Sequence, residues 1–499
     1  MKEVRLTVSP DFEIGEIDNR LFSSFIEHMG SVVYNGIYEP GHPKADSRGF
    51  RMDVLELVRE LNLHTLRYPG GNYTSGYNWE DTVGPVSERP VRLDLAWKQT
   101  EPNTFGLHEF LDWSREAGAE TIMTVNLGTR GADAARNLLE YCNYGGKSYW
   151  SDLRRRNGAA DPFGIKTWCL GNELDGTWQI CHKTAWEYGR LAAETARLMH
   201  FFNPKLETIV VGSSGSEMPT FPEWDRTILE ECYDDVEYIA VHKYISHDNR
   251  DTPTFLAAPI GMDRQIETII STADYVRSLR RSPKKLMLSF DEWNVSSGVN
   301  AVIPQEDWLI GPDRDKTPYD FEQSLAAAGM MLSLLRHADR VKIACQAILV
   351  NVLPLITADK NGPAFRTAIF YPFKLISHYG RGKALRSAYD GPVYQCAEFE
   401  NVPSVDQAVV YREEQGELTV FAINRTAEPL PITIDGRAFL RLEPIEHLIY
   451  YHPLGARNSA LDPTKLDVLA RGCLNVDHGC GKAVLPEYSF NVLHFQCGV

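Results

Sequence analysis

The hydrophobic and polar positions of the chain follow two different patterns along its length. Up to about residue 375, short apolar runs alternate with segments that have the spacing of amphipathic helices, for example RMDVLELVRELN and WEYGRLAAETARLMHFF. Eight apolar runs predict strands, and they lie within residues 19–30, 63–71, 119–128, 166–173, 207–215, 236–244, 284–294 and 339–353. Strands that alternate with helices indicate parallel βαβ units, and eight such units predict an α/β fold of the (β/α)8 TIM barrel type.

A doubly wound parallel sheet is the alternative α/β architecture. Such a sheet often carries a phosphate-binding loop after its first strand. Here no Gly-x-Gly-x-x-Gly follows the first predicted strand, and the Walker phosphate loop is also missing from the chain. These features favour the barrel.

From about residue 375 onward, the pattern changes to short alternating strands. The segment AVVYREEQGELTVFAINRTAEPLPITIDG combines this alternation with turn residues such as Glu-Gln-Gly and Asp-Gly, which predicts an antiparallel β-sandwich. The N-terminal segment EVRLTVSP alternates in the same way and is expected to pair with it. The sequence therefore predicts two domains: a catalytic barrel over residues 17–375, and an additional all-β sandwich built from residues 1–16 and 376–499.

Composition and charge narrow the classes of function. The 499 residues are 43 % hydrophobic and 24 % charged, which is ordinary for a soluble globular enzyme. A net charge of −16 without a compensating basic run argues against a nucleic-acid or anionic-membrane partner. No apolar run reaches the roughly 18 residues of a membrane span, and the N-terminus lacks the apolar core of a signal peptide. Nine scattered cysteines fit a reducing compartment, so we expect a cytoplasmic protein.

The sequence predicts neither a cofactor nor a metal centre. Cys473, His478 and Cys480 in CLNVDHGC are metal-ligating residue types, but this segment lacks a second pair of ligands.

Polar side chains stand at the ends of most of the predicted barrel strands. These residues are Glu27 and His28, Arg67 with Asn72 just beyond it, Asn126, Asn172 and Glu173, His242 and Tyr244, and then Asp291, Glu292 and Trp293. A single such end, for example KTWCLGNELDG, is explained by a turn and a helix N-terminus, where acidic residues are favoured. Polar groups at six strand ends are harder to attribute to turns. They indicate an active site at the C-terminal face of the barrel, where barrel enzymes have theirs.

Two of these residues, Glu173 and Glu292, form a candidate catalytic pair. Counting strands places Glu173 at the end of the fourth and Glu292 at the end of the seventh, so that they face each other across the barrel mouth. Aromatic residues stand near both. Paired carboxylates in an aromatic-rich cleft suit glycoside hydrolysis. Because successive side chains of a strand alternate, Asp291 is expected to point away from Glu292 and to brace the barrel.

Four segments carry a resemblance to a known family. WCLGNELDG and LSFDEWNV resemble the catalytic signatures of glycoside hydrolase family 51, the α-L-arabinofuranosidases, and FSSFIEHMGSVVYNGIYEP and LRYPGGNYTSGYNWEDTVGP resemble its first and second strand motifs. The resemblance runs through essentially the whole chain. It implies a retaining, exo-acting hydrolase that releases terminal L-arabinofuranose from arabinan, arabinoxylan or derived oligosaccharides, with Glu173 as acid/base and Glu292 as nucleophile. It also implies a homohexamer.

The same resemblance implies how the sugar is bound. The implied subsite residues are Glu27, Arg67, Asn72, Asn172 and Tyr244, with Trp97 near the entrance. We also predict a binding role for His242, although a strand-end histidine often just satisfies buried backbone groups. For a retaining pair, the carboxyl groups are expected about 5–5.5 Å apart, rather than the 6.5–9.5 Å of an inverting pair.

The chain departs from the family pattern at two places near the expected sugar. DEWNVSSGVN replaces the usual DEWNVWY, which removes an aromatic wall near Ser296, and CQAILVNV replaces CLAQLVNV, which puts Ile348 at the subsite glutamine. Gln346 faces the same side two residues earlier and is expected to restore part of the contact about 7 Å lower in the barrel. The catalytic pair is intact, so the departures bear on sugar selectivity alone.

Three other functions compete with this interpretation. An endo-glucanase or related furanosidase of the same family would keep both glutamates, but an endo-acting enzyme needs an open cleft. Assays on long glucans and on aryl arabinofuranosides separate these possibilities. A metal-dependent sugar isomerase would need several ligands around a divalent ion and would be sensitive to chelators. A non-catalytic carbohydrate-binding protein would have little need for a catalytic pair.

Overall fold

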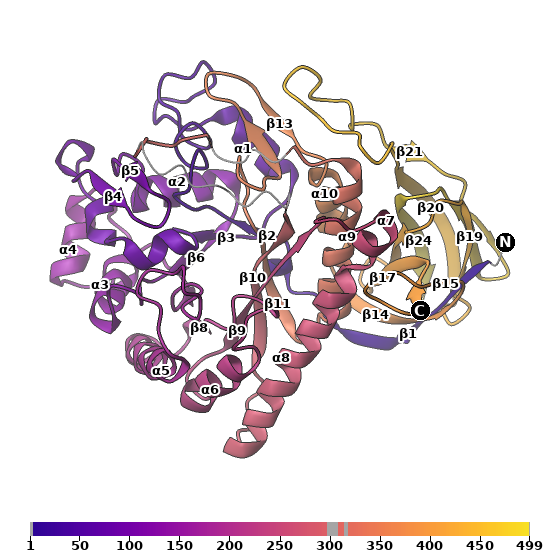
Figure 1. Cartoon of the computed structure of the whole chain (residues 1–499), viewed down its shortest axis with the longest axis horizontal. Coiled ribbons are helices and arrows are strands. Elements are labelled where there is room, and N and C mark those ends of the chain that lie inside the picture. The colour runs from indigo at the N-terminus through magenta and orange to yellow at the C-terminus, as the bar shows by residue number, and fades with distance from the viewer. Residues whose placement is uncertain (1–2, 297–307, 314–317, 499) are drawn as a thin grey trace.

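The computed structural model describes residues 3–296, 308–313 and 318–498 and consists of a closed barrel beside a ten-stranded sheet (Figure 1). The barrel strands are β2 (Ser23–Phe25), β3 (Thr65–Tyr68), β6 (Glu120–Thr124), β7 (Thr167–Cys169), β8 (Glu207–Val210), β9 (Tyr238–Ser246), β10 (Met287–Ser296) and β11 (Val341–Gln346). They pair in parallel in the order β10-β11-β2-β3-β6-β7-β8-β9. Each of them overlaps one of the eight predicted runs, so the predicted barrel is confirmed.

Helices surround the barrel (Figure 1). They are α1 (Met52–Glu60), α2 (Leu107–Ala117), α3 (Ala132–Asn143), α4 (Tyr149–Arg156), α5 (Ala185–Phe202), α6 (Glu223–Cys232), α7 (Thr252–Ala257), α8 (Pro259–Arg280), α9 (Phe321–Arg336) and α10 (Phe370–Tyr379). Helix α5 begins with a capping box of Thr184 and Glu187 and buries Tyr188, Ala192 and Met199 on one face. Among the helices described, none is long and apolar enough to cross a membrane.

Short elements fill the loops around the barrel. The 3-10 helices are η1 (Asn19–Leu21), η2 (Asn72–Gly76), η3 (Trp79–Thr82) and η4 (Val86–Glu88). The strand pairs are β4 (Arg92–Asp94) with β5 (Gln99–Glu101), β12 (Ile356–Ala358) with β13 (Ala364–Arg366), and β15 (Val393–Tyr394) with β16 (Val402–Pro403). Helices η2 to η4 and the β4–β5 pair all lie between β3 and α2, in the long loop that follows β3.

The ten-stranded sheet runs in the order β21-β20-β24-β18-β17-β14-β1-β19-β23-β22. Its strands are β1 (Val4–Glu16), β14 (Lys383–Asp390), β17 (Val405–Arg412), β18 (Glu417–Asn424), β19 (Leu430–Asp435), β20 (Arg441–Tyr450), β21 (Ala470–Arg471), β22 (Asn475–Asp477), β23 (Cys480–Leu485) and β24 (Ser489–Gly498). Strand β1 pairs with β14 and β19, which brings the N-terminal segment into this sheet. Strand β20 also contacts β22 and β23 from the other end of the order, so the sheet folds over on itself as a β-sandwich.

The apolar core of the barrel extends onto one face of the sheet, where it includes Phe421 and Val492, and a second core lies within the sheet. Leu6, Leu418 and Leu493 belong to the core of the sheet, whereas Leu288 on β10 belongs to the core of the barrel. Helix α9 lies between the two parts and contacts β14, β17 and β18 (Figure 1). One face of the sheet therefore packs against the barrel, and its other face encloses a core of its own.

Candidate active site

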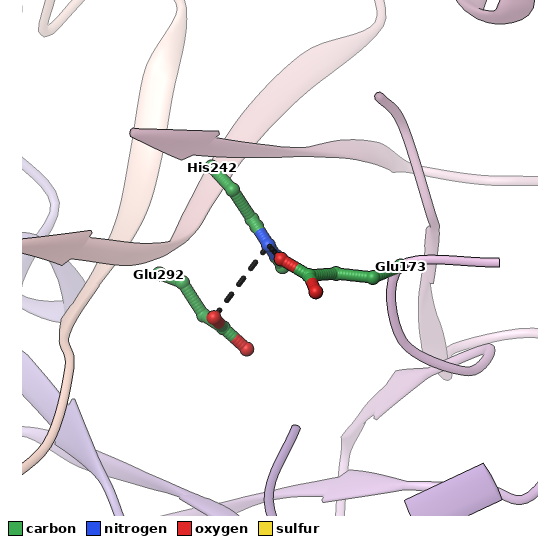
Figure 2. A group of neighbouring side chains, drawn as sticks. All are labelled: Glu173, His242 and Glu292. Carbon is green, nitrogen blue, oxygen red and sulfur yellow. Dashed lines mark hydrogen bonds and ion pairs between the residues drawn. The ribbon is translucent and has the colours of Figure 1, made fainter. Parts of the chain in front are cut away.

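Glu173 and Glu292 lie close together at the C-terminal ends of β7 and β10. Figure 2 shows the imidazole of His242, from β9, between the two carboxyl groups. One oxygen of each carboxyl group and a ring nitrogen of His242 all lie within 4.8 Å of one another. A retaining pair needs its carboxyl groups about 5–5.5 Å apart, and this arrangement is compatible with that separation. Glu173 itself has a φ of 42°, a left-handed conformation that is uncommon for residues other than glycine and is often found at functional sites.

Two donors hold the carboxylate of Glu292. A guanidinium nitrogen of Arg67 donates to Oε1 at 2.8 Å, and the hydroxyl of Tyr244 donates to Oε2, also at 2.8 Å. Arg67 also donates to Oδ1 of Asn172 at 2.7 Å, and Nδ2 of Asn172 donates to Oδ1 of Asn72 at 3.1 Å. A continuous chain of hydrogen bonds therefore fixes Glu292, because each of its members is oriented by the next.

Glu173 has a different environment. Burial raises the pKa of Glu173 above its ordinary value, and the negative charge of Glu292 raises it further. The hydrogen bond between Oε1 and Nδ1 of His242, at 2.9 Å, and the one from Nε1 of Trp178 to Oε2, at 2.8 Å, act in the opposite direction. The net effect favours a protonated carboxyl group, as a general acid requires.

His242 links Glu173 to the barrel interior. Its Nδ1 faces Glu173, and its Nε2 lies 3.1 Å from Oδ1 of Asp291. Burial lowers the pKa of His242, but the surrounding carboxylates, first that of Glu292, outweigh burial and hold this pKa well above its ordinary value. A protonated His242 donates to Glu173 and to Asp291 at the same time, and this fixes the orientation of the acid.

The prediction that Asp291 points away from Glu292 was wrong. Both carboxylates face Arg67 and His242, and Oδ2 of Asp291 lies 3.5 Å from Nε of Arg67. The reason is an irregularity in β10: its register with β9 shifts between Ser289 and Glu292, which interrupts the strict alternation of side chains. Asp291 still braces the barrel, since it joins residues of β3 and β9.

Glu27 lies beside the pair and is held by two nitrogen donors. Its Oε1 accepts hydrogen bonds from the backbone N–H of Tyr73 at 2.9 Å and from Nε1 of Trp97 at 2.8 Å. Burial, with a contribution from the charge of Glu292, raises the pKa of Glu27 to about 8. The loop beside it needs glycine, because Gly70 has a φ of 132° and a Cβ there would lie 2.4 Å from Cγ of Glu27.

These residues surround a cavity of about 220 Å³. Its lining consists of Phe25, Glu27, Met29, Gly71, Asn72, Trp97, Glu173, Tyr244, Glu292, Ile348, Val352 and Leu353. This volume is below the roughly 300–1,000 Å³ of pockets for drug-sized ligands, and it suits a single sugar residue. A larger hollow of about 720 Å³ lies between α6 and α8 and is lined by none of the candidate residues in the described chain.

The predicted site residues occupy two levels. Glu27, Asn72, Trp97, Glu173, Tyr244 and Glu292 line the cavity, and Arg67, Asn172, His242 and Gln346 contact these or other lining residues from within the barrel. Gln346 uses both ends of its amide there. Its Nε2 donates to the carbonyl of Leu353 at 3.1 Å, and its Oε1 accepts from Ser24 at 3.1 Å.

Sequence reasoning missed the apolar side of the cavity. Phe25, Met29, Val352 and Leu353 belong to no chemical motif, and their position just within or after β2 and β11 is the only signal that could have found them. Ile348 was noted as a departure, and it does line the cavity. Ser296, the other departure, ends β10, and residues 297–307 after it lie outside the described chain.

The group in Figure 2 is also the one set of His, Cys, Asp and Glu side chains in the described residues with the compactness of a metal site. Each of its three atoms already has a protein partner, however, and the guanidinium of Arg67 is 2.8 Å from Glu292. A fixed positive charge beside a ligand disfavours a divalent cation. The group is better suited to moving a proton than to holding a metal ion.

Known proteins with the same sequence features were found over almost the whole chain. The profile of the α-L-arabinofuranosidase 1 domain matches residues 57–255, and that of the α-L-arabinofuranosidase C-terminal domain matches residues 291–489. An intracellular exo-α-(1→5)-L-arabinofuranosidase 1 from Bacillus subtilis is 50 % identical over 91 % of both chains. One from Halalkalibacterium halodurans is 49 % identical over 98 % of both.

A solved structure agrees with these matches. The family 51 α-L-arabinofuranosidase of Bifidobacterium longum superposes with a TM-score of 0.95 at 37 % identity, covering 99 % of this chain and 100 % of that one. The similarity thus includes both the barrel that carries the glutamate pair and the folded-over sheet. The chain belongs to glycoside hydrolase family 51, the α-L-arabinofuranosidases.

Proposed function

We propose that this protein is a retaining, exo-acting α-L-arabinofuranosidase that releases terminal arabinofuranose from arabinan, arabinoxylan or oligosaccharides derived from them. The observation that carries the proposal is the short distance between Glu173 and Glu292 at the wall of a cavity the size of one sugar. The names of the Bacillus and Halalkalibacterium relatives, both intracellular exo-α-(1→5)-L-arabinofuranosidases, support the substrate class and a cytoplasmic location.

In the first step, a carboxylate oxygen of Glu292 attacks C1 of the sugar, and the bond from C1 to the leaving oxygen breaks. Glu173 gives its proton to that oxygen, so the leaving group departs as an alcohol and Glu173 is left as a carboxylate. The pKa of Glu173, raised by burial and by the charge of Glu292, suits this donation. Formation of the ester removes the negative charge of Glu292, which lowers the pKa of Glu173 for the second step.

In the second step, the ionised Glu173 takes a proton from water as the water oxygen attacks C1 and the ester bond to Glu292 breaks. Both displacements invert C1, so the product keeps the configuration of the substrate. His242 keeps the acid in position through both steps by its hydrogen bonds to Glu173 and Asp291.

The remaining candidate residues are proposed to bind and orient the sugar. Asn172 would bond the 2-hydroxyl, a contact that strengthens in the transition state, and Arg67 and Tyr244 would hold Glu292 in line with C1. Glu27, Asn72 and Trp97 would contact other parts of the sugar from the cavity wall. Gln346 would support the cavity floor through Leu353.

The test is an assay with aryl furanosides and pyranosides, with NMR observation of the first product. We expect hydrolysis of the aryl α-L-arabinofuranoside with release of the α-anomer before mutarotation. Release of the β-anomer would contradict the retaining assignment. Faster action on long glucans than on the arabinofuranoside would instead support the endo-glucanase alternative.

The proposal also covers the oligomeric state and the division into domains. We propose a homohexamer, which light scattering on the purified protein tests directly. We also propose the division of the chain into a barrel over residues 17–375 and a sandwich of residues 1–16 with 376–499. Limited proteolysis that cuts first between the end of α10 at Tyr379 and the start of β14 at Lys383 would support this division, and first cuts within the barrel would contradict it.

A further inference from the structure

The cavity has one polar side and one apolar side, and the difference bears on which sugars fit. We propose that Ile348 and its apolar neighbours make the enzyme tolerant of furanosides that lack the exocyclic 5-hydroxyl, so that 5-deoxy-α-L-arabinofuranosides are substrates. This inference rests on the proposed arabinofuranosidase function and deepens it, since it names a substrate class for the same site.

The polar groups converge at one end of the cavity. A Cβ atom at Gly71 would lie 3.1 Å from an oxygen of Glu27, 3.1 Å from Oε1 of Glu292 and 3.5 Å from Nδ2 of Asn172. Three polar side chains from three different strand ends therefore meet at a single point next to the nucleophile. Hydroxyl groups near C1 of a bound sugar have their hydrogen-bonding partners here.

The apolar residues line the cavity from two adjacent strands. Phe25 and Met29 come from β2 and the segment after it, and Ile348, Val352 and Leu353 follow β11, which pairs with β2. In the closed barrel, β11 is four strands away from β7 in a ring of eight. Ile348 therefore lies across the barrel from the strand that ends at Glu173.

The polar end of the cavity and the line of the displacement together decide which side of the sugar meets Ile348. C1 must lie between Glu173 and Glu292, with the leaving oxygen at Glu173. In a furanose ring, the atoms farthest from C1 are C3 and C4, and C4 carries the exocyclic C5. Attack by Glu292 puts its oxygen, C1 and the leaving oxygen on one line, so the ring lies to the side of that line. With the 2-hydroxyl at the polar end beside Asn172, the C4–C5 side of the ring meets the rest of the lining, which includes Ile348.

Among the described residues, the polar side chains of β11, of the segment after it and of Asn294 on β10 are bonded to the protein itself. Gln346 bonds Ser24 and Leu353, the amide nitrogen of Asn294 donates to the carbonyl of Leu353 at 2.7 Å, and that of Asn351 donates to the carbonyl of Ser31 at 2.7 Å. These bonds also fix the backbone of residues 347–353, so that the apolar wall is preformed. Ile348 is only 4 % exposed and offers the sugar a hydrocarbon surface.

A site that is built to hydrogen-bond a hydroxyl rejects the deoxy analogue by a factor of about 10⁴ or more, because its own polar groups are left unpaired. An apolar wall has no such groups to leave unpaired. It accommodates the methyl group of a 5-deoxy sugar as readily as a hydroxymethyl group. The selectivity for the 5-hydroxyl is therefore expected to be small.

The experiment compares two aryl α-L-arabinofuranosides with the same leaving group, one with the 5-hydroxyl and one without it. For the unmodified protein, we expect kcat/KM values within about tenfold of each other. Two variants then test the role of Ile348: Ile348→Gln introduces an amide, and Ile348→Met introduces an apolar side chain of the same length. Melting temperatures establish that both variants fold.

The preference for the hydroxylated substrate is expected to rise at least about tenfold in Ile348→Gln relative to Ile348→Met, a gain of about 1.4 kcal/mol. Because the two variants are compared on the same two substrates, differences in the intrinsic reactivity of the substrates cancel. Equal preferences in the two variants would overturn the inference. So would a preference above about tenfold for the hydroxyl in the unmodified protein, which decides the matter even if neither variant folds. Failure to hydrolyse either arabinofuranoside would overturn the proposed function itself.

Discussion

The mouth of the barrel and the interior of the ten-stranded sheet are equally buried but contain opposite kinds of side chain. Arg67 and Asp291 are fully buried below the cavity, and Glu292 is 5 % exposed. In the sheet, positions of the same burial are occupied by Leu418 and Val420. The sheet core buries apolar side chains, as stable protein interiors usually do, whereas the barrel mouth buries charged ones.

The difference reflects the electrostatic requirements of an active site at the barrel mouth. A buried charge is unfavourable unless hydrogen bonds and an opposite charge compensate for it. Arg67 compensates Glu292 and Asp291, and together with His242 it holds the pKa of Asp291 below its ordinary value in spite of burial. Glu173 is bonded to His242 and Glu27 to uncharged donors, and both keep raised pKa values because burial outweighs these contacts. The barrel mouth therefore holds carboxyl groups in two electrostatic environments, one beside the guanidinium of Arg67 and one in which burial favours the protonated form, whereas the core around Leu418 in the sheet is apolar.

Removal of Glu292, the proposed nucleophile, is the most severe test of this contrast. The Glu292→Ala variant should lose at least about 10⁴-fold in kcat on every substrate, however good the leaving group, because no glycosyl-enzyme can form. Steady-state assays on an aryl arabinofuranoside measure the loss. Azide, if it rescues the variant, should give a product of inverted configuration. The control is Glu443→Ala in the sheet, which should leave activity unchanged; comparable losses in both variants would break the comparison.

Removal of the acid/base should have a smaller effect that depends on the leaving group. The Glu173→Ala variant should lose at least about a hundredfold on a natural arabinoside, whose leaving group needs a proton. On an activated aryl arabinofuranoside, the glycosyl-enzyme should still form and should accumulate, since no base activates water. Azide needs no base and should restore turnover with a product of retained configuration. If the azide products of the two glutamate variants are exchanged, their roles are exchanged as well.

A matched pair of leucines tests whether stability and activity reside in different parts of the molecule. Leu418→Ala in the sheet and Leu288→Ala in β10 each remove a fully buried side chain and should each reduce the free energy of unfolding by about 2–5 kcal/mol. Only Leu288→Ala should also lower kcat, because it loosens the strand that carries Glu292. Denaturation curves and assays at a temperature where both variants are folded measure the two effects. An equal loss of kcat in Leu418→Ala would show that the sheet also shapes the site.

Most of the fold could be predicted from the sequence because its signals are local and repeated. Eight apolar runs separated by amphipathic helices leave few architectures open, and each run overlaps a barrel strand. The polar ends of those runs were equally readable, since in a barrel all strand ends meet at one face. The facing positions of Glu173 and Glu292 follow from counting strands.

The parts that could not be predicted depend on contacts between distant segments. The irregularity in β10 that turns Asp291 toward His242 has no local sequence signal, because the register of β10 is set by its partner strands. The apolar wall was missed for a similar reason. Met29 and Val352 are ordinary buried residues in the sequence, and only the pairing of β11 with β2 brings them to the same cavity. Gln346 looked available for the sugar until the structure showed its amide bonded to Ser24 and Leu353.

The smallest predicted effect concerns pH and the histidine between the two carboxyls. The hydrogen bond and charge of His242 lower the pKa of Glu173, against the larger effects of burial and Glu292 that raise it. The His242→Gln variant removes this opposition, so the pKa of Glu173 should rise. Activity requires protonated Glu173 in the first step and is lost as the pH rises through that pKa. The alkaline limb of the kcat/KM profile should therefore move to higher pH, with about a tenfold loss at the optimum from poorer positioning. His478→Gln makes the same substitution at an almost fully exposed histidine of the sheet and should leave the profile unchanged. An alkaline limb that stays in place, or moves to lower pH, would mean that His242 does not lower the pKa of the group that controls this limb.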